Sequence, residues 1–311
     1  MSVILLGPQG PRPNLPQTLA ALDIPGPIAT ITAGWEERES EDADLDSDVV
    51  EAAVGGATIN LELFRRWVEV LHADPEFHAA MRRRDAVLLE MQEVYNLRLD
   101  HAMQAVYAIQ RRTGHPAIHE TELADAIESV RALDEHHFAV SRDVYDESYD
   151  RWPPHTRPAV VAHREEVATL LGRSASLAIA GGHVGVLQAC LHMFNVAASI
   201  GERPVVAWSA GAMAISERIV LFHDRAPQGP GHAELFDAGI GLCRGVLPLP
   251  DAHRRLRLAD HDRMAALARR FAPLTCVTLD EGSRAVIDGG SLSLQGARSI
   301  GTDGRTTGAA A

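Results

Sequence analysis

The sequence predicts an α/β fold in which a mainly parallel sheet carries helices on both faces and a large helical insert interrupts the chain. Two observations lead to this prediction. Short, nearly continuous apolar runs that end at glycine occur in the first and last parts of the chain, and such runs are typical of buried parallel strands. Between them, apolar residues recur at steps of three and four, which is typical of long helices.

The N-terminal part, residues 1–56, contains two of these runs. Residues 3–6 are followed by Gly7-Pro8, and residues 28–32 are followed by Ala33-Gly34. An acid-rich stretch comes next, and residues 36–51 contain nine acidic residues and one arginine. Such a stretch is usually a solvated loop or the start of a helix. We therefore expect two strands of the α/β domain and an acidic loop in this part.

The middle part, residues 57–171, is predicted to be the helical insert. Apolar residues at helical spacing between Leu88 and Ile109 indicate one long helix, and similar patterns precede and follow it. Gly114, Pro116 and the stretch 151–154 separate the helices. The remaining faces carry many charged and polar residues, so we expect a solvated outer surface.

Strands return in residues 172–298, and we expect this segment to complete the α/β domain. Glycine residues follow the apolar runs, and a glycine pair marks the turn of a hairpin. From residue 299 to residue 311 the chain is rich in glycine and threonine, and we expect a disordered tail. The predicted strands are residues 177–180, 204–208 and 275–279, with the hairpin over 284–294.

Composition excludes several classes of protein. All 29 basic residues are arginine, so Schiff-base chemistry, a phosphate-binding P-loop lysine and a Ser-x-x-Lys nucleophile pair are absent. The net charge of −13 argues against a nucleic-acid partner, because binding a phosphate backbone needs a basic face. That acidity lies in residues 1–170, whereas residues 171–311 carry a charge of +2, so an acidic substrate is compatible with this part.

Location and cofactors follow from further absences in the sequence. No run of about 18 apolar residues and no export signal is present, so we expect no membrane partner. The three cysteines lie far apart, which fits a reducing cytoplasm. The chain has no His-Glu-x-x-His motif and no compact cluster of His and Cys, so we expect no metal and no cofactor.

The segment Ala207-Trp208-Ser209-Ala210-Gly211 carries the clearest chemical signal. A serine at an abrupt turn from a buried strand into a helix is lifted clear of the sheet, and small neighbours avoid collisions there. The helix N-terminus behind it offers free N–H groups to a developing oxyanion. Gly181-Gly182, directly after another strand, allows close approach of the backbone and a second N–H donor. Both segments are also compatible with simple tight turns.

These motifs, with Gly239-Ile240-Gly241-Leu242, Asp251-Ala252-His253 and Leu279-Asp280-Glu281-Gly282, occur in an order that resembles the serine peptidase family of dipeptidase E and cyanophycinase. The resemblance covers roughly residues 171–290. It implies a fold like that of class I glutamine amidotransferases, with serine in place of cysteine at the nucleophile elbow. It also implies hydrolysis of a peptide or amide bond through an acyl-enzyme, without a cofactor.

The resemblance assigns roles residue by residue. Ser209 is the expected nucleophile, His253 the base and Glu281 the carboxylate that orients it, and the N–H groups of Gly182 and Ala210 form the oxyanion hole. Arg254 and Arg255, directly after the base, are candidate partners for a substrate carboxylate. Three residues differ from the usual family pattern, namely His183, Trp208 and Arg254.

Alternatives remain open at this stage. Other residues compete for the role of base or of orienting carboxylate. An esterase is compatible with the same elbow. A non-catalytic binding or scaffold protein that uses the helical insert to contact a partner or form a homodimer is an alternative of another class. The competing residues are His223, His232, His261, Asp224 and Asp237.

Overall fold

The computed structural model describes residues 1–41, 45, 47–225 and 231–308. A central sheet of seven strands has the order β11-β10-β1-β5-β4-β2-β3. The five strands from β1 to β3 in this order run parallel to their neighbours, and β10 and β11 form an antiparallel hairpin at the β1 edge. The seven strands are β1 (Val3–Leu6), β2 (Ile28–Ile31), β3 (Thr58–Asn60), β4 (Ser176–Ile179), β5 (Val205–Trp208), β10 (Arg284–Asp288) and β11 (Ser291–Gln295).

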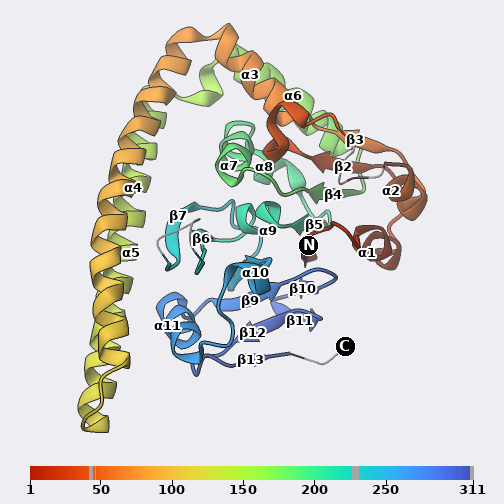
Figure 1. Cartoon of the computed structure of the whole chain (residues 1–311). Helices are drawn as coiled ribbons and strands as arrows, with labels where there is room; N and C mark the ends of the chain where they lie inside the picture. Colours follow the sequence, from red (N-terminus) through yellow and green to blue (C-terminus); the bar gives the residue numbers. More distant parts are fainter. Residues whose placement is uncertain (42–44, 46, 226–230, 309–311) are drawn as a thin grey trace.

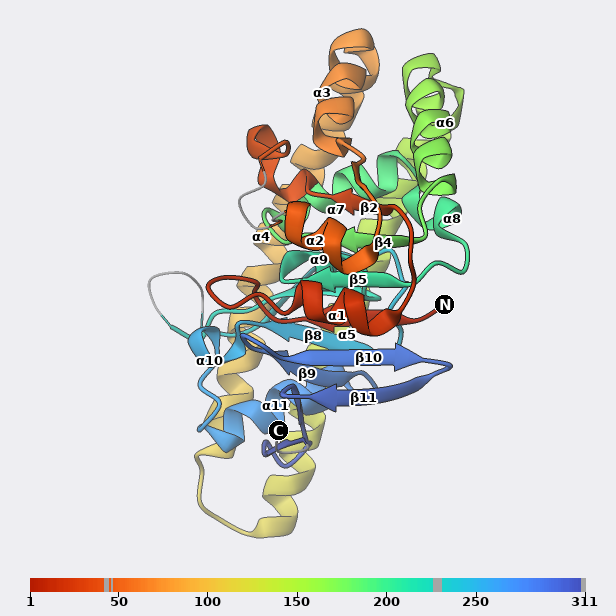
Figure 2. The same ribbon diagram turned by 90° about the vertical axis from the view of Figure 1, so that its right-hand side faces the viewer.

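The other strands of the described residues form two smaller sheets. The strand over 275–279, expected beside the others, belongs to a separate sheet of four strands, in which it pairs in parallel with β8. Figure 2 shows β8 and β9 of the four-stranded sheet, with β8 leading into a short helix, α10. The four-stranded sheet holds β8 (Val246–Pro250), β9 (Thr275–Leu279), β12 (Arg298–Ile300) and β13 (Thr306–Thr307), and a two-stranded sheet holds β6 (Arg218–Leu221) and β7 (Glu234–Ala238).

Helices account for most of the remaining structure. Prolines at the first turns of several helices fit the helical φ angle and lack an N–H that would be unpaired there. The helices are α1 (Leu15–Leu22), η1 (Ala33–Arg38), α2 (Ser47–Val54), α3 (Leu63–Ala73), α4 (Pro75–Gln110), α5 (Pro116–Arg151), η2 (Pro154–Thr156), α6 (Pro158–Gly172), α7 (Val184–Met193), α8 (Val196–Ile200), α9 (Ala210–Ala214), α10 (Ala252–Arg255) and α11 (His261–Phe271).

Alternate residues of the central strands face two different cores. Val3 and Leu5 of β1 pack in the core that contains residues of α3, α6, α7 and α9. Ile4 and Leu6 pack on the other face, with residues of α1 and α2. Because successive side chains of a strand point to opposite faces, both faces of the sheet are covered. The predicted α/β fold with a mainly parallel sheet is confirmed.

The helical insert is dominated by α4 and α5, two helices of 36 residues each. They lie side by side as a long antiparallel hairpin along one side of the molecule (Figure 1). Residues of both helices share a third core with β6, β7, β8 and α11. The segment 57–171 is not entirely insert, because Thr58–Asn60 forms β3 of the central sheet.

Two expectations for the other segments need correction. We expect residues 299–311 to be disordered, but in the described part of this segment β12 and β13 pair with each other, and β12 also pairs with β9. Residues 309–311 lie outside the described residues. The acid-rich stretch is not wholly solvated, because Glu39 is buried and accepts the N–H groups of Phe64 and Arg65 at the start of α3. These bonds satisfy donors that a helix start leaves unpaired. Residues 42–44 and 46 of that stretch lie outside the described residues.

Within the described ranges, no helix combines the length and apolar character needed to cross a membrane.

Candidate active site

Ser209 occupies the sharp turn between β5 and α9. Its backbone has φ 50° and ψ −125°, a conformation that costs energy for a residue with a Cβ. The turn is possible because its neighbours are small: a Cβ on Gly211 would lie 2.4 Å from the carbonyl oxygen of Ile179. Ala210 is buried, whereas Ser209 is half-buried. The strand–serine–helix geometry expected from the sequence is therefore present.

The glycine pair after β4 lies directly beside this turn. A Cβ on Gly181 would lie 2.7 Å from Cβ of Ser209, so only glycine fits at that position. Gly182 has φ +111°, and a Cβ there would lie 2.2 Å from the carbonyl oxygen of Gly34. Among the described residues, the N–H groups of Gly182 and Ala210 donate to no acceptor. Both are therefore available to an incoming oxygen atom.

His253 follows a strand of the four-stranded sheet. β8 ends at Pro250, and Asp251 then takes a left-handed conformation (φ 56°, ψ 39°) that turns the chain into α10. The N–H of Asp251 donates to the carbonyl of Leu279, the last residue of β9, at 2.9 Å. These contacts hold the start of α10 against the end of β9, where Asp280 follows.

Asp280 is the hydrogen-bond partner of His253. Its Oδ1 lies 2.8 Å from Nδ1 of the ring and accepts the backbone N–H of His253 at 2.9 Å. Asp251 Oδ1 is farther from the same ring nitrogen, at 3.6 Å. The neighbouring Glu281, to which the family resemblance assigned this role, instead forms an ion pair with Nε of Arg12 at 3.1 Å. The carboxylate bonded to the ring of His253 is thus that of Asp280, one residue before Glu281.

Gly7 lies beside the turn at Ser209 and packs against the backbone of Asp280. In the parallel pairing of β1 and β5, Leu6 lies opposite Trp208, so the residues that follow are Gly7 and Ser209. A Cβ on Gly7 would lie 1.8 Å from the carbonyl oxygen of Asp280, so these two backbones are in close contact. Ser209 and His253 therefore lie at the same edge of the molecule. No hydrogen bond joins the two side chains in the described structure, and catalytic hydrogen bonds often form only with substrate bound.

Most of the competing residues have other partners. The carboxylate of Asp224 pairs with Arg263 at 2.8 Å and accepts the N–H of Arg257. The carboxylate of Asp237 accepts the hydroxyl of Tyr145, and His261 Nδ1 lies 3.3 Å from the carbonyl of Gly304.

Burial lowers the pKa of two further competitors, His223 and His232. His223 lies beside α10, because the N–H of the next residue, Asp224, donates to the carbonyl of Arg255 at 2.8 Å. His183 caps the start of α7, where Nδ1 accepts the N–H of Val186 at 3.2 Å.

Arg254 and Arg255 differ in exposure. The side chain of Arg254 is 72% exposed, and its Nε lies 3.9 Å from Asp251. The guanidinium carbon of Arg255 lies 5.8 Å from the ring centre of Phe222. Arg254 is thus the more accessible of the two cations beside His253.

The same cluster has the donor atoms for a metal ion. One ligand atom each from Asp251, His253 and Asp280 lie within 4.8 Å of one another. A nitrogen and two carboxylate oxygens suit a divalent cation. The hydrogen bond between His253 and Asp280 uses the same atoms for orientation of the ring.

Comparison with known proteins gives only distant similarities. No family model matches the sequence, and no curated protein matches it. A crystal structure of a peptidase from an acI-B1 actinobacterium aligns with a TM-score of 0.47 and 12% identity, over 97% of this chain and 91% of that one. A putative peptidase E protein from Listeria monocytogenes aligns with a TM-score of 0.45 and 9% identity, over 94% of this chain and 97% of that one.

Proposed function

We propose that the protein is a serine hydrolase that cleaves a peptide or amide bond through an acyl-enzyme on Ser209, as the resemblance to the dipeptidase E family implies. The observation that carries the proposal is the strained backbone of Ser209 beside two N–H groups, those of Gly182 and Ala210, that have no other acceptor in the described structure. Strain of this kind concentrates at functional sites because the fold must hold it against its energetic cost.

The proposed reaction has two steps. Ser209 Oγ attacks the carbonyl carbon of the substrate while Nε2 of His253 takes the hydroxyl proton, and the N–H groups of Gly182 and Ala210 donate to the oxyanion. The C–N bond then breaks, and His253 gives its proton to the leaving amine. In the second step His253 takes a proton from a water molecule, and the water oxygen attacks the acyl carbon. The C–O bond to Ser209 then breaks, and His253 gives the proton to Ser209 Oγ.

Asp280 has a defined role in this scheme. Its bond to Nδ1 of His253 keeps a proton on that nitrogen, so Nε2 is the atom that exchanges protons with Ser209. Its negative charge also stabilises the imidazolium that forms after attack. Asp280 replaces Glu281 in our assignment of the catalytic residues.

Arg254 is the residue we assign to substrate recognition. Its guanidinium is exposed beside the proposed base and can form two parallel hydrogen bonds with a carboxylate. A peptide with an acidic residue near the cleaved bond fits this arrangement. The charge of +2 on residues 171–311 is compatible with such a substrate.

Peptide hydrolysis tests the function directly. We would incubate the protein with dipeptides that vary the first residue, and with matched esters, and follow the products by mass spectrometry. The proposal predicts cleavage of amides that is lost in Ser209→Ala, with a preference for acidic substrates that weakens in Arg254→Ala. Cleavage of esters alone would indicate an esterase instead.

A scaffold protein of the same fold is the second candidate. Four apolar side chains on α4, those of Val87, Leu89, Val94 and Leu97, are 46%, 62%, 54% and 63% exposed. Exposed apolar side chains along one helix suit a protein contact, including one with a second copy of the chain. A stable complex through α4, together with no hydrolysis of any amide or ester, would favour this candidate.

A further inference from the structure

A cavity of about 510 Å³ lies between the helical hairpin and the α/β part of the molecule. Its walls come from α4, α5, α7 and β7, and neither Ser209 nor His253 lines it. Cavities of this size accommodate small organic ligands and typically combine apolar walls with a few polar groups. The apolar walls include Phe77, Met81, Leu88, Phe138, Leu235 and Phe236.

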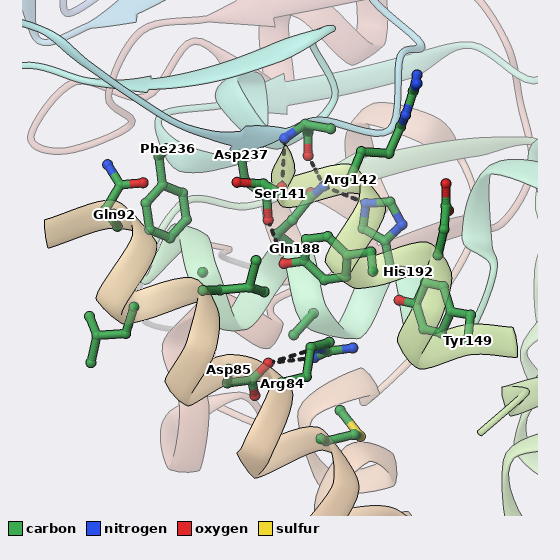
Figure 3. Close-up of a pocket in the computed structure, with 18 of the residues that line it drawn as sticks. Arg84, Asp85, Gln92, Ser141, Arg142, Tyr149, Gln188, His192, Phe236 and Asp237 are labelled. Atoms are coloured by element: carbon green, nitrogen blue, oxygen red, sulfur yellow. Dashed lines mark hydrogen bonds and ion pairs between the residues drawn. The ribbon is translucent and has the colours of Figure 1, made fainter. Parts of the chain in front are cut away.

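Arg84 places a buried positive charge in the wall of this cavity (Figure 3). Its side chain is 8% exposed, and its guanidinium carbon lies 4.9 Å from the ring centre of Tyr145 and 5.9 Å from that of Tyr149. Nε and Nη2 donate to one oxygen of Asp85, and in the described structure the other guanidinium N–H groups have no acceptor. A guanidinium has five N–H groups, so a carboxylate that enters the cavity would find unused donors.

Tyr145 holds Arg84 in this position. Its hydroxyl donates to the carboxylate of Asp237 at 2.9 Å, and Asp237 also accepts the N–H of Ala238 at 2.7 Å. Burial raises the pKa of Asp237. The ring of Tyr145 is thus fixed at one end by a hydrogen bond and packs against the guanidinium, which pre-organises the cation before any ligand arrives.

Gln188 lines the cavity and has a buried acceptor atom without a partner among the described residues. The residue is 2% exposed, and its amide nitrogen donates to the carbonyl of Ala238 and lies 2.6 Å from Nε2 of His192. Burial lowers the pKa of His192 and so favours the neutral ring, in which Nε2 accepts this N–H when the ring proton is on Nδ1. The amide oxygen of Gln188 is buried with no partner among the described residues. A buried acceptor of this kind is costly unless a donor satisfies it.

We propose that this cavity binds a small molecule with an apolar body, a carboxylate and an amide N–H, as at the C-terminal end of an apolar peptide or in an N-acylated amino acid. The carboxylate pairs with Arg84, the N–H donates to the oxygen of Gln188, and the apolar body packs between α4 and β7. The cavity is separate from Ser209, so this inference stands whether or not the protein is a hydrolase.

Binding of two matched probes tests the inference. N-acetyl-phenylalanine carries all three features, whereas N-acetyl-phenylalanine amide lacks the carboxylate. Titration calorimetry on wild type and on Ser209→Ala separates binding from any hydrolysis. We expect the acid to bind both proteins, and the amide to bind at least about tenfold more weakly.

Variants locate the binding site. Arg84→Gln is expected to weaken the acid about tenfold or more, and Ala189→Trp, which fills the cavity from α7, is expected to abolish binding. Arg83→Gln, at an exposed neighbouring position, serves as the matched control and should bind as wild type does. Circular dichroism checks the fold of each variant.

Three results would overturn the inference. The first is equal affinity for the acid and the amide, and the second is binding of the acid that survives in folded Ala189→Trp. The third is no binding of either probe at about 10 mM, a concentration that corresponds to a binding free energy of roughly −3 kcal/mol. If Arg84→Gln does not fold, the comparison of acid with amide on the wild type decides, since it needs no variant.

Discussion

Asp280 Oδ1 binds both the ring Nδ1 and the backbone N–H of His253, at 2.8 and 2.9 Å. The two residues come from different strand ends, because His253 follows β8 and Asp280 follows β9. The parallel pairing of these strands brings Pro250 opposite Leu279 and so sets the two side chains together. One oxygen therefore fixes both the start of α10 and the orientation of the imidazole.

Replacement of this carboxylate should affect reactivity, and replacement of its neighbour should not. We expect Asp280→Asn to slow covalent labelling of Ser209 by a fluorophosphonate by about 10²- to 10⁴-fold, because the asparagine no longer holds the right tautomer of His253. Glu281→Gln, which loses the ion pair with exposed Arg12, should label within about threefold of wild type. Labelling rates measured by mass spectrometry distinguish the two, and a larger effect of Glu281→Gln would restore the role that the family resemblance assigned to it.

Substitution of Gly181 should also slow the labelling of Ser209. A Cβ at this position would lie 2.7 Å from Cβ of Ser209, so Gly181→Ala must displace the serine turn. Because a misplacement of about 1 Å can slow a reaction roughly 10²-fold, we expect labelling to fall by about that factor.

Gly172→Ala is the matched control for this change. A Cβ on Gly172 would meet nothing within 4 Å, so wild-type labelling is expected. Unchanged labelling of Gly181→Ala would contradict the close contact between the two strand ends.

How far the sequence predicts this site depends on the kind of signal. The elbow at Ser209 and the glycine pair 181–182 are visible because sterics allow few residue types there. The sequence cannot distinguish Asp280 from Glu281 as the partner of His253, because the side chains of adjacent residues point in different directions and the pairing of β8 with β9 decides which one meets the ring. Gly7 belongs to no recognisable motif, and its contact with Asp280 cannot be predicted without knowing which strands are neighbours.

The fold was predictable to a similar degree. Apolar runs indicated the parallel strands, but they carry no information on sheet order, so the placement of β9 in a second sheet was missed. Residues 299–311 look like a tail because glycine and threonine are common there, whereas β12 is held by pairing with β9, a long-range contact. The acidic run around Glu39 predicts a solvated side chain, but its carboxylate accepts two N–H groups at the start of α3.

Arg270 and Asp134 form a buried ion pair that attaches the helical hairpin to α11. Nε and Nη2 of Arg270 donate to both oxygens of Asp134 at 2.7 and 2.8 Å, and the hydroxyl of Tyr95 also donates to Asp134. Arg270→Met leaves a buried carboxylate without its cation, so we expect a loss of about 3–5 kcal/mol in the free energy of unfolding. Urea unfolding followed by circular dichroism measures it.

Two further variants make this prediction specific. Arg269→Met, at the exposed neighbouring position, should cost less than about 1 kcal/mol. The double variant Arg270→Met/Asp134→Leu should recover much of the loss, since no buried charge remains. Equal stability of Arg270→Met and wild type would mean that the pair does not hold the hairpin in place.

The hairpin should also lose stability in acid through His137. Its ring stacks on Tyr95 at a centroid distance of 4.1 Å, and burial lowers its pKa from the usual 6.5. The unfolded chain therefore binds a proton below about pH 6.5 that the folded chain does not, so the free energy of unfolding falls as the pH drops below that value. We expect His137→Gln to reduce the difference in unfolding free energy between pH 7.5 and 5.

His101→Gln is the control, because His101 is exposed on the neighbouring helix α4 and is not among the groups that shift the pKa of His137. Its pH dependence of unfolding should match that of wild type. An identical pH dependence in His137→Gln and wild type would show that protonation of His137 does not oppose folding.

The proposed function depends most on Ser209 as an activated nucleophile. Treatment with a fluorophosphonate, digestion, and mass spectrometry of the peptides locate any adduct to a single residue. We expect one adduct, on Ser209, that is absent in Ser209→Ala and forms at least about 10²-fold more slowly in folded His253→Ala. Folded wild-type protein that carries no adduct on Ser209, or that is labelled equally fast without His253, would contradict the proposed function.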